Sequence, residues 1–227
     1  MTLSDKLYKI LIQGGSWKTI LGGLWVTVRI SVFALIIGTV LGALICLLRT
    51  RKNPVPRIIA SVYIAILRGT PVLMLLLLLY YGVFARAGLK PVTVAVVTFA
   101  LNVSAHVAEL LRAALEAADH GQAEAARTLG FSAWTTFRLV TLPQVLRIAK
   151  PVYQSTIVNL IQWTSVVGYV TITDLTRVIN NTASRTMQPL LTISIGMLIY
   201  LALSYIVFGI FALSDRLSAK KRGGEAV

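Results

Sequence analysis

The 227-residue chain is poor in charged residues and in cysteine. Only 13% of its residues are Asp, Glu, Lys or Arg, whereas 56% are hydrophobic and the mean hydropathy is +0.78. The single cysteine, Cys46, excludes an intrachain disulfide and a cysteine-based metal site, and its apolar surroundings in the sequence predict a small buried side chain. This composition is unusual for a water-soluble domain and typical of a bundle of membrane-spanning helices.

Acidic residues are scarcer than basic ones, with 8 Asp and Glu against 22 Lys and Arg and a formal net charge of +14. Such an excess can indicate a nucleic-acid partner, but these basic residues lie in short clusters between apolar runs and not along one face. The few carboxylates form no cluster of catalytic or metal-binding spacing. We therefore expect no nucleic-acid partner, no catalytic residue and no metal site.

A phosphate-binding loop is also missing. The sequence contains no Gly followed after four residues by Gly-Lys and Ser or Thr, and the segment "GGSWKT" at residues 14–19 lacks that spacing. The chain is therefore predicted not to hydrolyse ATP by such a loop, not to be an enzyme, and to hold no cofactor of its own.

Five apolar runs are long enough to cross a bilayer. They cover residues 30–48, 58–84, 92–111, 152–170 and 189–213. In the second run, Pro71 disfavours helix at Thr70, so a kink or break is expected there. In the first, Gly38 and Gly42 share a helix face and would let a neighbouring helix approach closely. The predicted fold is an all-α membrane protein with five transmembrane helices in one domain, residues 1–227.

The segments between these runs differ in basic residues. Those after the first, third and fifth runs hold four, five and four, thirteen in total, whereas the other three hold four, two and two, eight in total. Because basic segments stay in the cytoplasm, the N-terminus is expected outside and the C-terminus in the cytoplasm.

Residues 121–143 form the most polar segment in the middle of the chain, and on this topology they face the cytoplasm. Gln122 to Leu129 favour a helix, and Gly130 can end it in a left-handed conformation. Ser132 can cap a second helix, which is expected to end near Pro143. The small Ala125–Ala126 pair would let another protein pack closely against this compact unit.

Polar residues inside membrane spans are costly and usually face the interior of the bundle. In the third run Asn102, His106 and Glu109 have the spacing of one helical face. The fourth run carries overlapping polar stripes that include Thr156, Asn159, Gln162 and Trp163. These seven residues are the candidates for a substrate pathway.

Plainer interpretations of the same residues stay open. His106 can be a packing residue, and Glu109 can pair with Arg112 three residues on. Asn159 and Gln162 can serve as hydrogen bonds between helices, each worth about 0.6 to 2 kcal/mol.

The polar segment contains a spaced motif. Glu124-Ala125-Ala126 is followed after three residues by Gly130 and after nine more by Val140-Thr141-Leu142-Pro143. It resembles the EAA loop of ABC importer permeases, with Val140 where the family pattern has Ile. Other stretches, "RGTP" at 68–71, "SAHVAELLRAAL" at 104–115, "GQ" at 121–122, "LPQVLR" at 142–147 and Thr164-Ser165, resemble permeases of the polar amino-acid uptake family. That family includes histidine, glutamine and arginine permeases of the type I fold, and the resemblance covers nearly the whole chain from the first apolar run onward.

The resemblance implies a permease subunit of an ATP-binding cassette importer that moves an amino acid across the bacterial cytoplasmic, or inner, membrane. Its implied partners are two copies of an ATPase subunit that bind ATP and Mg, a second identical or homologous permease, an extracytoplasmic solute-binding protein and the lipid bilayer. The polar segment would be the coupling helix that docks into the ATPase subunit. Its docking residues would be Glu124, Ala125, Ala126, Gly130, Leu142 and Pro143.

The chain departs from the family pattern in its fourth apolar run. Many relatives carry Asn-Glu at the positions of Ser155-Thr156 and Lys-Asp at those of Gln162-Trp163, where the carboxylates can meet a cationic side chain. Their loss here favours a neutral or apolar substrate, or recognition by a sister permease. Three alternatives to the importer remain: a carrier driven by an ion gradient, an ABC permease for another solute, such as an exporter or lipid-handling subunit, and an assembly factor without transport.

Overall fold

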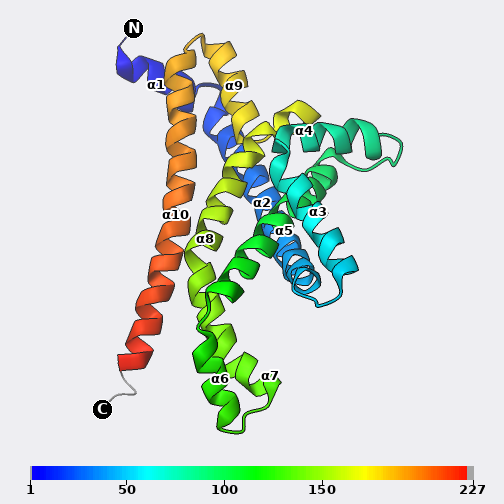
Figure 1. Ribbon diagram of the computed structural model, residues 1–227. Coiled ribbons are helices and arrows are strands. Elements are labelled where there is room, and N and C mark those ends of the chain that lie inside the picture. Colours follow the sequence, from blue (N-terminus) through cyan, green and yellow to red (C-terminus); the bar gives the residue numbers. More distant parts are fainter. Residues whose placement is uncertain (1, 224–227) are drawn as a thin grey trace. The chain divides into compact units, whose positions relative to one another are not determined.

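The structure is a computed structural model that describes residues 2–223, and these residues form helices and connecting segments without a strand (Figure 1). The elements follow in the order α1 (Leu3–Leu11), η1 (Gln13–Gly15), α2 (Ser16–Arg49), α3 (Pro54–Gly69), α4 (Val72–Leu77), η2 (Leu78–Val83), α5 (Pro91–Ala117), α6 (His120–Thr128), α7 (Ala133–Thr136), η3 (Phe137–Thr141), α8 (Leu142–Trp163), η4 (Thr164–Val170), α9 (Leu175–Thr186) and α10 (Pro189–Gly223). The prediction of an all-α fold is confirmed.

The chain divides into two compact units that exchange segments along the sequence. Unit 1 comprises residues 1–33, 72–97 and 157–227, and unit 2 comprises residues 34–71 and 98–156. Helices α2, α5 and α8 therefore each contribute one part to unit 1 and another to unit 2. The single domain expected from the sequence stays a prediction.

Within the described residues, three helices are long and apolar enough to cross a membrane: α2, α5 and residues 189–217 of α10. The broken pair of α3 and α4–η2 adds a fourth if it counts as one span. The predicted fourth span, 152–170, is not among these long apolar helices. Helix α8 is rich in polar residues and passes into the 3-10 helix η4 at Thr164. A count of five spans and the orientation of the termini thus remain predictions.

Helix α2 begins at Ser16, well ahead of the first predicted span at residues 30–48, and the bounds of that span stay a prediction. Gly15 adopts a left-handed φ of 71°, and the Ser16 hydroxyl donates to the Gln13 carbonyl at 2.7 Å, which turns the chain into the helix. Of the two glycines in the first half of this helix, Gly23 is required by packing. A Cβ at Gly23 would lie 2.8 Å from the Asp174 carbonyl oxygen, a close approach that only glycine permits.

The break predicted at Thr70 is confirmed. Thr70 has an extended conformation (φ −100°, ψ 133°) between α3 and Pro71. The last carbonyls of α3 have no partner within the helix, and one of them, the Leu67 carbonyl, accepts a hydrogen bond from Asn102 Nδ2 at 3.0 Å. Asn102, on α5, thereby stabilises the interrupted end of α3 in unit 2.

Close packing of α2 on α5 in unit 2 depends on the two glycines identified in the sequence. A Cβ at Gly38 would lie 2.7 Å from Val103 Cβ, and one at Gly42 would lie 2.6 Å from Val107 Cβ. Cys46, next along α2, is buried as expected and packs with Ile64 and Ala108. The small-residue stripe therefore sets the distance between the two helices.

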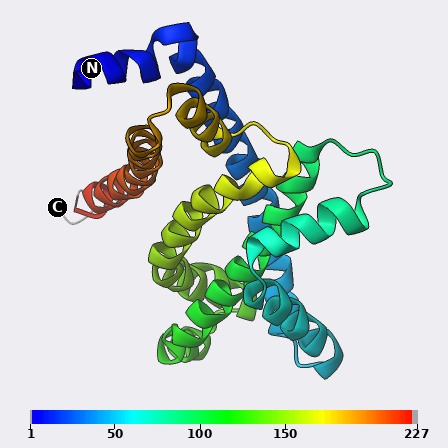
Figure 2. The same ribbon diagram turned by 90° about the horizontal axis from the view of Figure 1, so that it is seen from above.

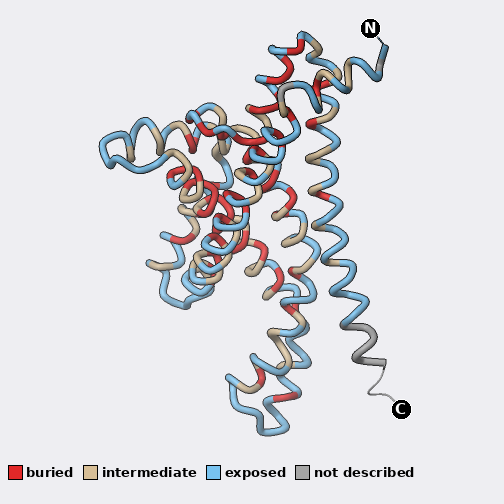
Figure 3. The backbone as a smooth tube through the Cα atoms, turned by 180° about the vertical axis from the view of Figure 1, so that it is seen from behind, coloured by how far each residue is buried: buried red, intermediate tan, exposed pale blue. Residues whose placement is uncertain are grey.

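Unit 1 is organised around α9, a helix that the sequence analysis treated as a loop. The buried residues Ile20, Leu175, Val178 and Ile179 form its core cluster. Helix α9 lies beside the beginning of α10 (Figure 2) and also contacts α1. Most of α10 beyond this contact is exposed (Figure 3), as expected of a helix whose remaining surface faces lipid or another protein.

The contact of α2 with α5 leads to a prediction. Gly42→Ala should lower the free energy of unfolding by about 1–3 kcal/mol, because the added methyl overpacks against Val107 and the Ser104 carbonyl. The measurement is thermal unfolding of the purified chain in detergent.

Gly22→Ala is the matched control, since a Cβ at Gly22 on the same helix would meet nothing within 4 Å. Alanine also favours helix over glycine by about 1 kcal/mol. A stability of Gly42→Ala equal to that of Gly22→Ala would contradict the proposed close contact.

Candidate functional site

Residues 119–144, here called the coupling unit, form a helix–turn–helix within unit 2 (Figure 1). Asp119 caps α6, because its Oδ1 accepts hydrogen bonds from the backbone N–H of Gly121 and of Gln122. At the other end Gly130 has a φ of 90°, and the backbone N–H groups of Gly130 and Phe131 donate to the carbonyls of Arg127 and Ala126. These bonds form a Schellman motif, so the predicted role of Gly130 as the end of the first helix is confirmed.

The second helix begins as predicted but does not end at Pro143. Ser132 Oγ accepts a hydrogen bond from Thr135 N at 3.1 Å and caps α7. The chain then widens into the π-helix η3, in which Leu142 N donates to the Phe137 carbonyl, and continues as α8. The wider turn changes the pairing of backbone groups ahead of Pro143, which has no N–H to donate, so the proline is accommodated and the helix runs on.

Several large apolar side chains are exposed on the coupling unit. Leu129 is 79% exposed and Trp134 is 68% exposed, Phe131 is also exposed, and the Trp134 ring stacks on Phe137 with 6.0 Å between centroids. These side chains extend from a segment that is otherwise polar. Exposed aromatic residues of this kind commonly mark a protein-binding surface.

The expected docking residues differ in exposure. Glu124, Ala125, Gly130 and Pro143 are exposed, Leu142 is half-buried, and Ala126 is buried within the coupling unit. The interpretation of Ala125–Ala126 as one packing surface is therefore wrong for Ala126. Its carbonyl accepts the Phe131 N–H of the Schellman motif, which turns this residue toward the unit's own turn.

Gln144 ties the coupling unit to the first turn of α8. Its Oε1 accepts a hydrogen bond from the Asp119 backbone N–H at 3.0 Å, and its Nε2 donates to Gln122 Oε1 at 2.9 Å. The two glutamines belong to the "GQ" and "LPQ" stretches of the sequence. Two hydrogen bonds thus join α6 directly to α8.

A second site in unit 2 is a cavity of about 380 Å³. Its lining brings together four polar residues, Arg68, His106, Glu109 and Thr156, among apolar side chains of α5 and α8. Glu109 accepts from Arg112 at 2.7 Å, as anticipated, and Arg112 also pairs with Glu116. The Thr156 hydroxyl donates to the Val152 carbonyl at 2.9 Å. A cation, a carboxylate and an apolar wall can together hold a small zwitterion.

Asn102 does not belong to this cavity, although the sequence placed it on the same helical face as His106 and Glu109. It is 3% exposed, and its amide bonds to the end of α3. Its Oδ1 is buried without a hydrogen-bond partner in the described structure. The side chain therefore stabilises unit 2, and its place on a solute pathway stays a prediction.

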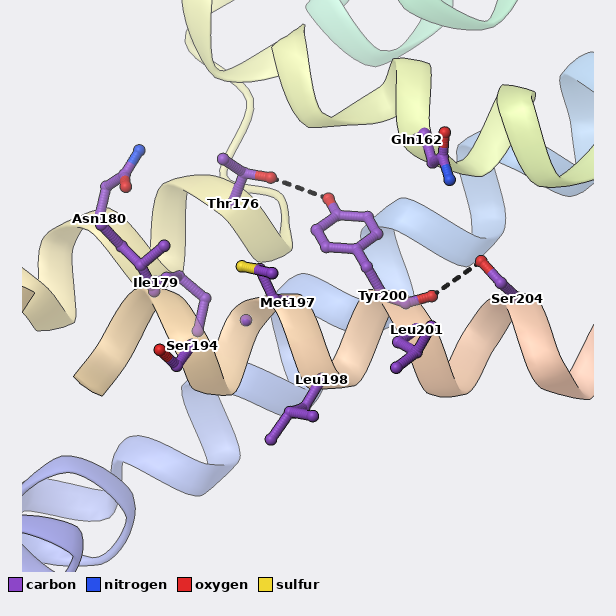
Figure 4. Close-up of a pocket in the computed structure, with 12 residues that line it drawn as sticks. Gln162, Thr176, Ile179, Asn180, Ser194, Met197, Leu198, Tyr200, Leu201 and Ser204 are labelled. Atoms are coloured by element: carbon purple, nitrogen blue, oxygen red, sulfur yellow. Dashed lines mark hydrogen bonds between the residues drawn. The ribbon is translucent and has the colours of Figure 1, made fainter. Parts of the chain in front are cut away.

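The remaining candidates lie in unit 1, where a groove of about 560 Å³ runs along α10 (Figure 4). Gln162 of α8 lines this groove, Asn159 is exposed, and Trp163 is half-buried. The Tyr200 hydroxyl, from α10, lies 2.8 Å from that of Thr176 on α9. The groove is largely apolar with a polar edge, so it suits the apolar part of a solute or of a neighbouring protein.

Helix α9 is held at this groove by a capped N-terminus. Asp174 is fully buried and accepts hydrogen bonds from the backbone N–H of Thr176 at 3.1 Å and of Arg177 at 3.0 Å. Burial raises the pKa of the Asp174 carboxyl, and these two hydrogen bonds act in the opposite direction. Arg177 in turn donates to the Gly168 carbonyl at 2.9 Å and fastens η4 to α9.

Several residues of these sites were not predicted. Arg68 was noted in the sequence without a role, and Leu129, Phe131 and Trp134 were overlooked. A signal was present for the last three, because a polar helical segment that carries large apolar residues at its turn needs a partner. No sequence signal indicated Tyr200, since its hydroxyl meets Thr176 only through the packing of α9 on α10.

Comparisons with known proteins agree with this architecture. Residues 19–219 match the family model described as binding-protein-dependent transport system inner membrane component. The chain is 38% identical over 162 residues to a probable amino-acid ABC transporter permease protein, YckA, of Bacillus subtilis, covering 70% of this chain and 71% of the relative. It is 32% identical to the L-cystine transport system permease protein TcyB of the same organism, covering 86% and 84%. A crystal structure of an amino acid ABC transporter with histidines superposes with a TM-score of 0.79 at 30% identity, covering 88% and 94%.

The cap of α9 gives a test of how the groove is held. Asp174→Ala should lower the free energy of unfolding by about 1 kcal/mol or more, because two backbone N–H groups lose a buried acceptor. Asp174→Asn keeps an oxygen that can cap the helix, so it should lower the free energy of unfolding by less than Asp174→Ala does. Thermal unfolding of both variants in lipid nanodiscs makes the comparison, and equal losses would show that capping is not what Asp174 contributes.

Proposed function

Because the chain belongs to the family of inner-membrane components of binding-protein-dependent transport systems, we propose that it is the permease subunit of an ATP-binding cassette importer for an amino acid. In this family ATP is hydrolysed by a partner chain, so the subunit itself is a transporter component and not an enzyme. The observation that carries the proposal is the coupling unit, a rigid, capped helix–turn–helix with an exposed apolar surface. The amino-acid relatives support the choice of solute.

The coupling unit docks on the ATPase subunit in this proposal. Leu129, Phe131 and Trp134 supply its apolar contact, and Glu124 and Ala125 lie exposed on the preceding helix. When ATP draws two ATPase subunits together, each would move the coupling unit bound to it. Gln144 and the continuous helix from α7 through η3 to α8 would transmit that movement to the cavity of unit 2.

The cavity of unit 2 is proposed as part of the solute pathway. Arg68 would bind the α-carboxylate of the amino acid, and Glu109, already paired with Arg112, would complement the α-ammonium. His106 and Thr156 complete the polar lining, and neither provides a carboxylate for a cationic side chain. We therefore expect a neutral amino acid. Asn159, Gln162 and Trp163 are proposed for a further part of the pathway in unit 1.

The proposed assembly contains two ATPase subunits, a second permease that is identical or homologous, and an extracytoplasmic solute-binding protein. It lies in the bacterial cytoplasmic membrane, with five spans, the N-terminus outside and the coupling unit in the cytoplasm. ATP binding would favour the state that opens toward the binding protein, and hydrolysis would favour the other. Each ligand shifts this equilibrium only by its difference in affinity for the two states.

The alternatives make different demands on the chain. An ion-gradient carrier would need no ATPase, so copurification of an ATPase subunit with this chain would exclude it. A permease for another solute would be an ABC component that no amino acid stimulates. An exporter or lipid-handling subunit would not depend on a solute-binding protein, and an assembly factor would show no solute-dependent ATP hydrolysis.

Docking of the coupling unit gives the first functional prediction. Trp134→Ala should weaken copurification of the ATPase subunit and lower transport at least tenfold, because an exposed aromatic anchor of an interface is typically worth about 2 kcal/mol or more. The measurement is pull-down and uptake at equal membrane levels of the permease.

Trp25→Ala is the matched control, since Trp25 is 64% exposed on α2 and belongs to unit 1, whereas the coupling unit belongs to unit 2. Gly130→Asp should also abolish docking, because an aspartate at a φ of 90° is strained and adds charge at the turn. Normal ATPase binding and uptake in both Trp134→Ala and Gly130→Asp would refute the docking assignment.

Recognition of the α-carboxylate of the amino acid leads to the second functional prediction. Arg68→Gln should raise the amino-acid concentration for half-maximal ATPase stimulation by about tenfold to a hundredfold, because a charge-assisted hydrogen bond is worth about 1.5–3 kcal/mol. Arg57→Gln, an exposed arginine at the start of the same helix, should leave it unchanged. Stimulation is measured in nanodiscs with the binding protein and each amino acid in turn.

Two outcomes would be decisive against this proposal. An unchanged half-maximal concentration in Arg68→Gln would remove Arg68 from the solute site. Stimulation by arginine or lysine that is lost on changing Thr156 or Trp163 would show that the solute is cationic.

A further inference from the structure

Helix α1 lies ahead of the segment that matches the family model, which begins at residue 19. Its start is fixed by a capping box, in which Thr2 Oγ1 accepts from Asp5 N at 3.3 Å and Asp5 Oδ2 accepts from Thr2 N at 2.8 Å. A helix of nine residues is marginal in water on its own. The surfaces that cover it therefore decide where it lies.

One face of α1 is covered by unit 1. Ile10 is fully buried, and Leu11 packs against the core cluster around α9. From α9, Arg185 reaches the link between α1 and α2, with Nη2 donating to Ser16 Oγ at 2.5 Å and Nη1 to the Gln13 carbonyl at 3.5 Å. The position of α1 is thus coupled to that of α9.

Another face of α1 is exposed and carries a large apolar residue beside the polar Ser4 and Asp5 of the first turn. Tyr8, on α1, and Ile12, which directly follows the helix, are 59% and 54% exposed. Along α2 the exposed apolar residues continue with Trp17, Leu21 and Trp25. Because α2 is long and apolar enough to span a bilayer, its exposed apolar residues are expected to meet lipid. The apolar surface of α1 leads directly into this lipid-facing stretch.

The charges of this region complete the pattern. Lys6 and Lys9 lie three residues apart on the polar side of α1, and the Lys18 ammonium lies 5.5 Å from the centroid of the Trp17 ring. Lysines beside aromatic and aliphatic residues on a short amphipathic helix are typical of the membrane–water interface. The ammonium groups complement the phosphates of anionic lipids.

We propose that α1 lies in the plane of the membrane–water interface, with Tyr8 and Ile12 at the boundary of headgroups and acyl chains and Lys6 and Lys9 at lipid phosphates. The bilayer surface then holds α1, and α1 holds α9 beside the groove of unit 1. This anchor is independent of the solute and of the ATPase, so its test does not depend on the proposed function.

The test uses the full-length chain in nanodiscs with Cys46→Ala, so that one cysteine is introduced at a time. A nitroxide is attached at Tyr8→Cys, at Ile12→Cys and, as the water-facing control, at Lys9→Cys. We expect oxygen to relax the labels at positions 8 and 12 more effectively than a soluble nickel chelate does, and the reverse at position 9. Equal access of the nickel chelate to all three labels would overturn the proposal.

Protection of positions 8 and 12 from both reagents would also overturn it, because a second copy of the chain or another protein would then cover this face. A second measurement needs no cysteine. Lys6→Gln with Lys9→Gln should lower the melting temperature in nanodiscs that contain phosphatidylglycerol and leave it unchanged in phosphatidylcholine. An equal change in both lipids would refute a role for lipid phosphates.

Discussion

Backbone hydrogen bonding constrains this chain at every place where a helix is interrupted. A membrane offers no water to an unpaired carbonyl or N–H, so each interruption requires a partner from elsewhere in the structure. Asn102 donates a hydrogen bond to the end of α3, and Arg177 donates one to the Gly168 carbonyl of η4. Asp174 accepts a hydrogen bond at the start of α9. These polar residues hold the ends of the interrupted helices in place, and helices in turn supply the residues that line the cavity and the groove.

The long apolar helices could be predicted from the sequence, because hydropathy over some twenty residues reports directly on the bilayer. Their starts could not. Ser16 begins α2 because of the turn at Gly15, and Gly23 stays helical because α9 packs against it. The short helices α1 and α9 were not predicted because they are amphipathic and not long apolar runs, although each begins at a side-chain cap.

The coupling unit could be predicted well because its signals are local. Gly130 and Ser132 take the positions that their residue types favour, whereas the end expected at Pro143 was wrong because a π-helix admits the proline. The cavity of unit 2 was only partly predictable. The spacing of His106 and Glu109 indicated a shared face, but nothing in the sequence joined Arg68 to them or turned Asn102 away toward α3.

The π-helix η3 also gives a meaning to the number of residues between Gly130 and Leu142. Removing or adding one residue along a continuous helix turns everything beyond it by about 100° around the axis. Since α7, η3 and α8 follow one another without a break, such a change would swing Leu129 and Trp134 to a different side of α8. The number of residues in this stretch therefore sets the direction, around the axis of α8, in which the exposed side chains of the coupling unit point.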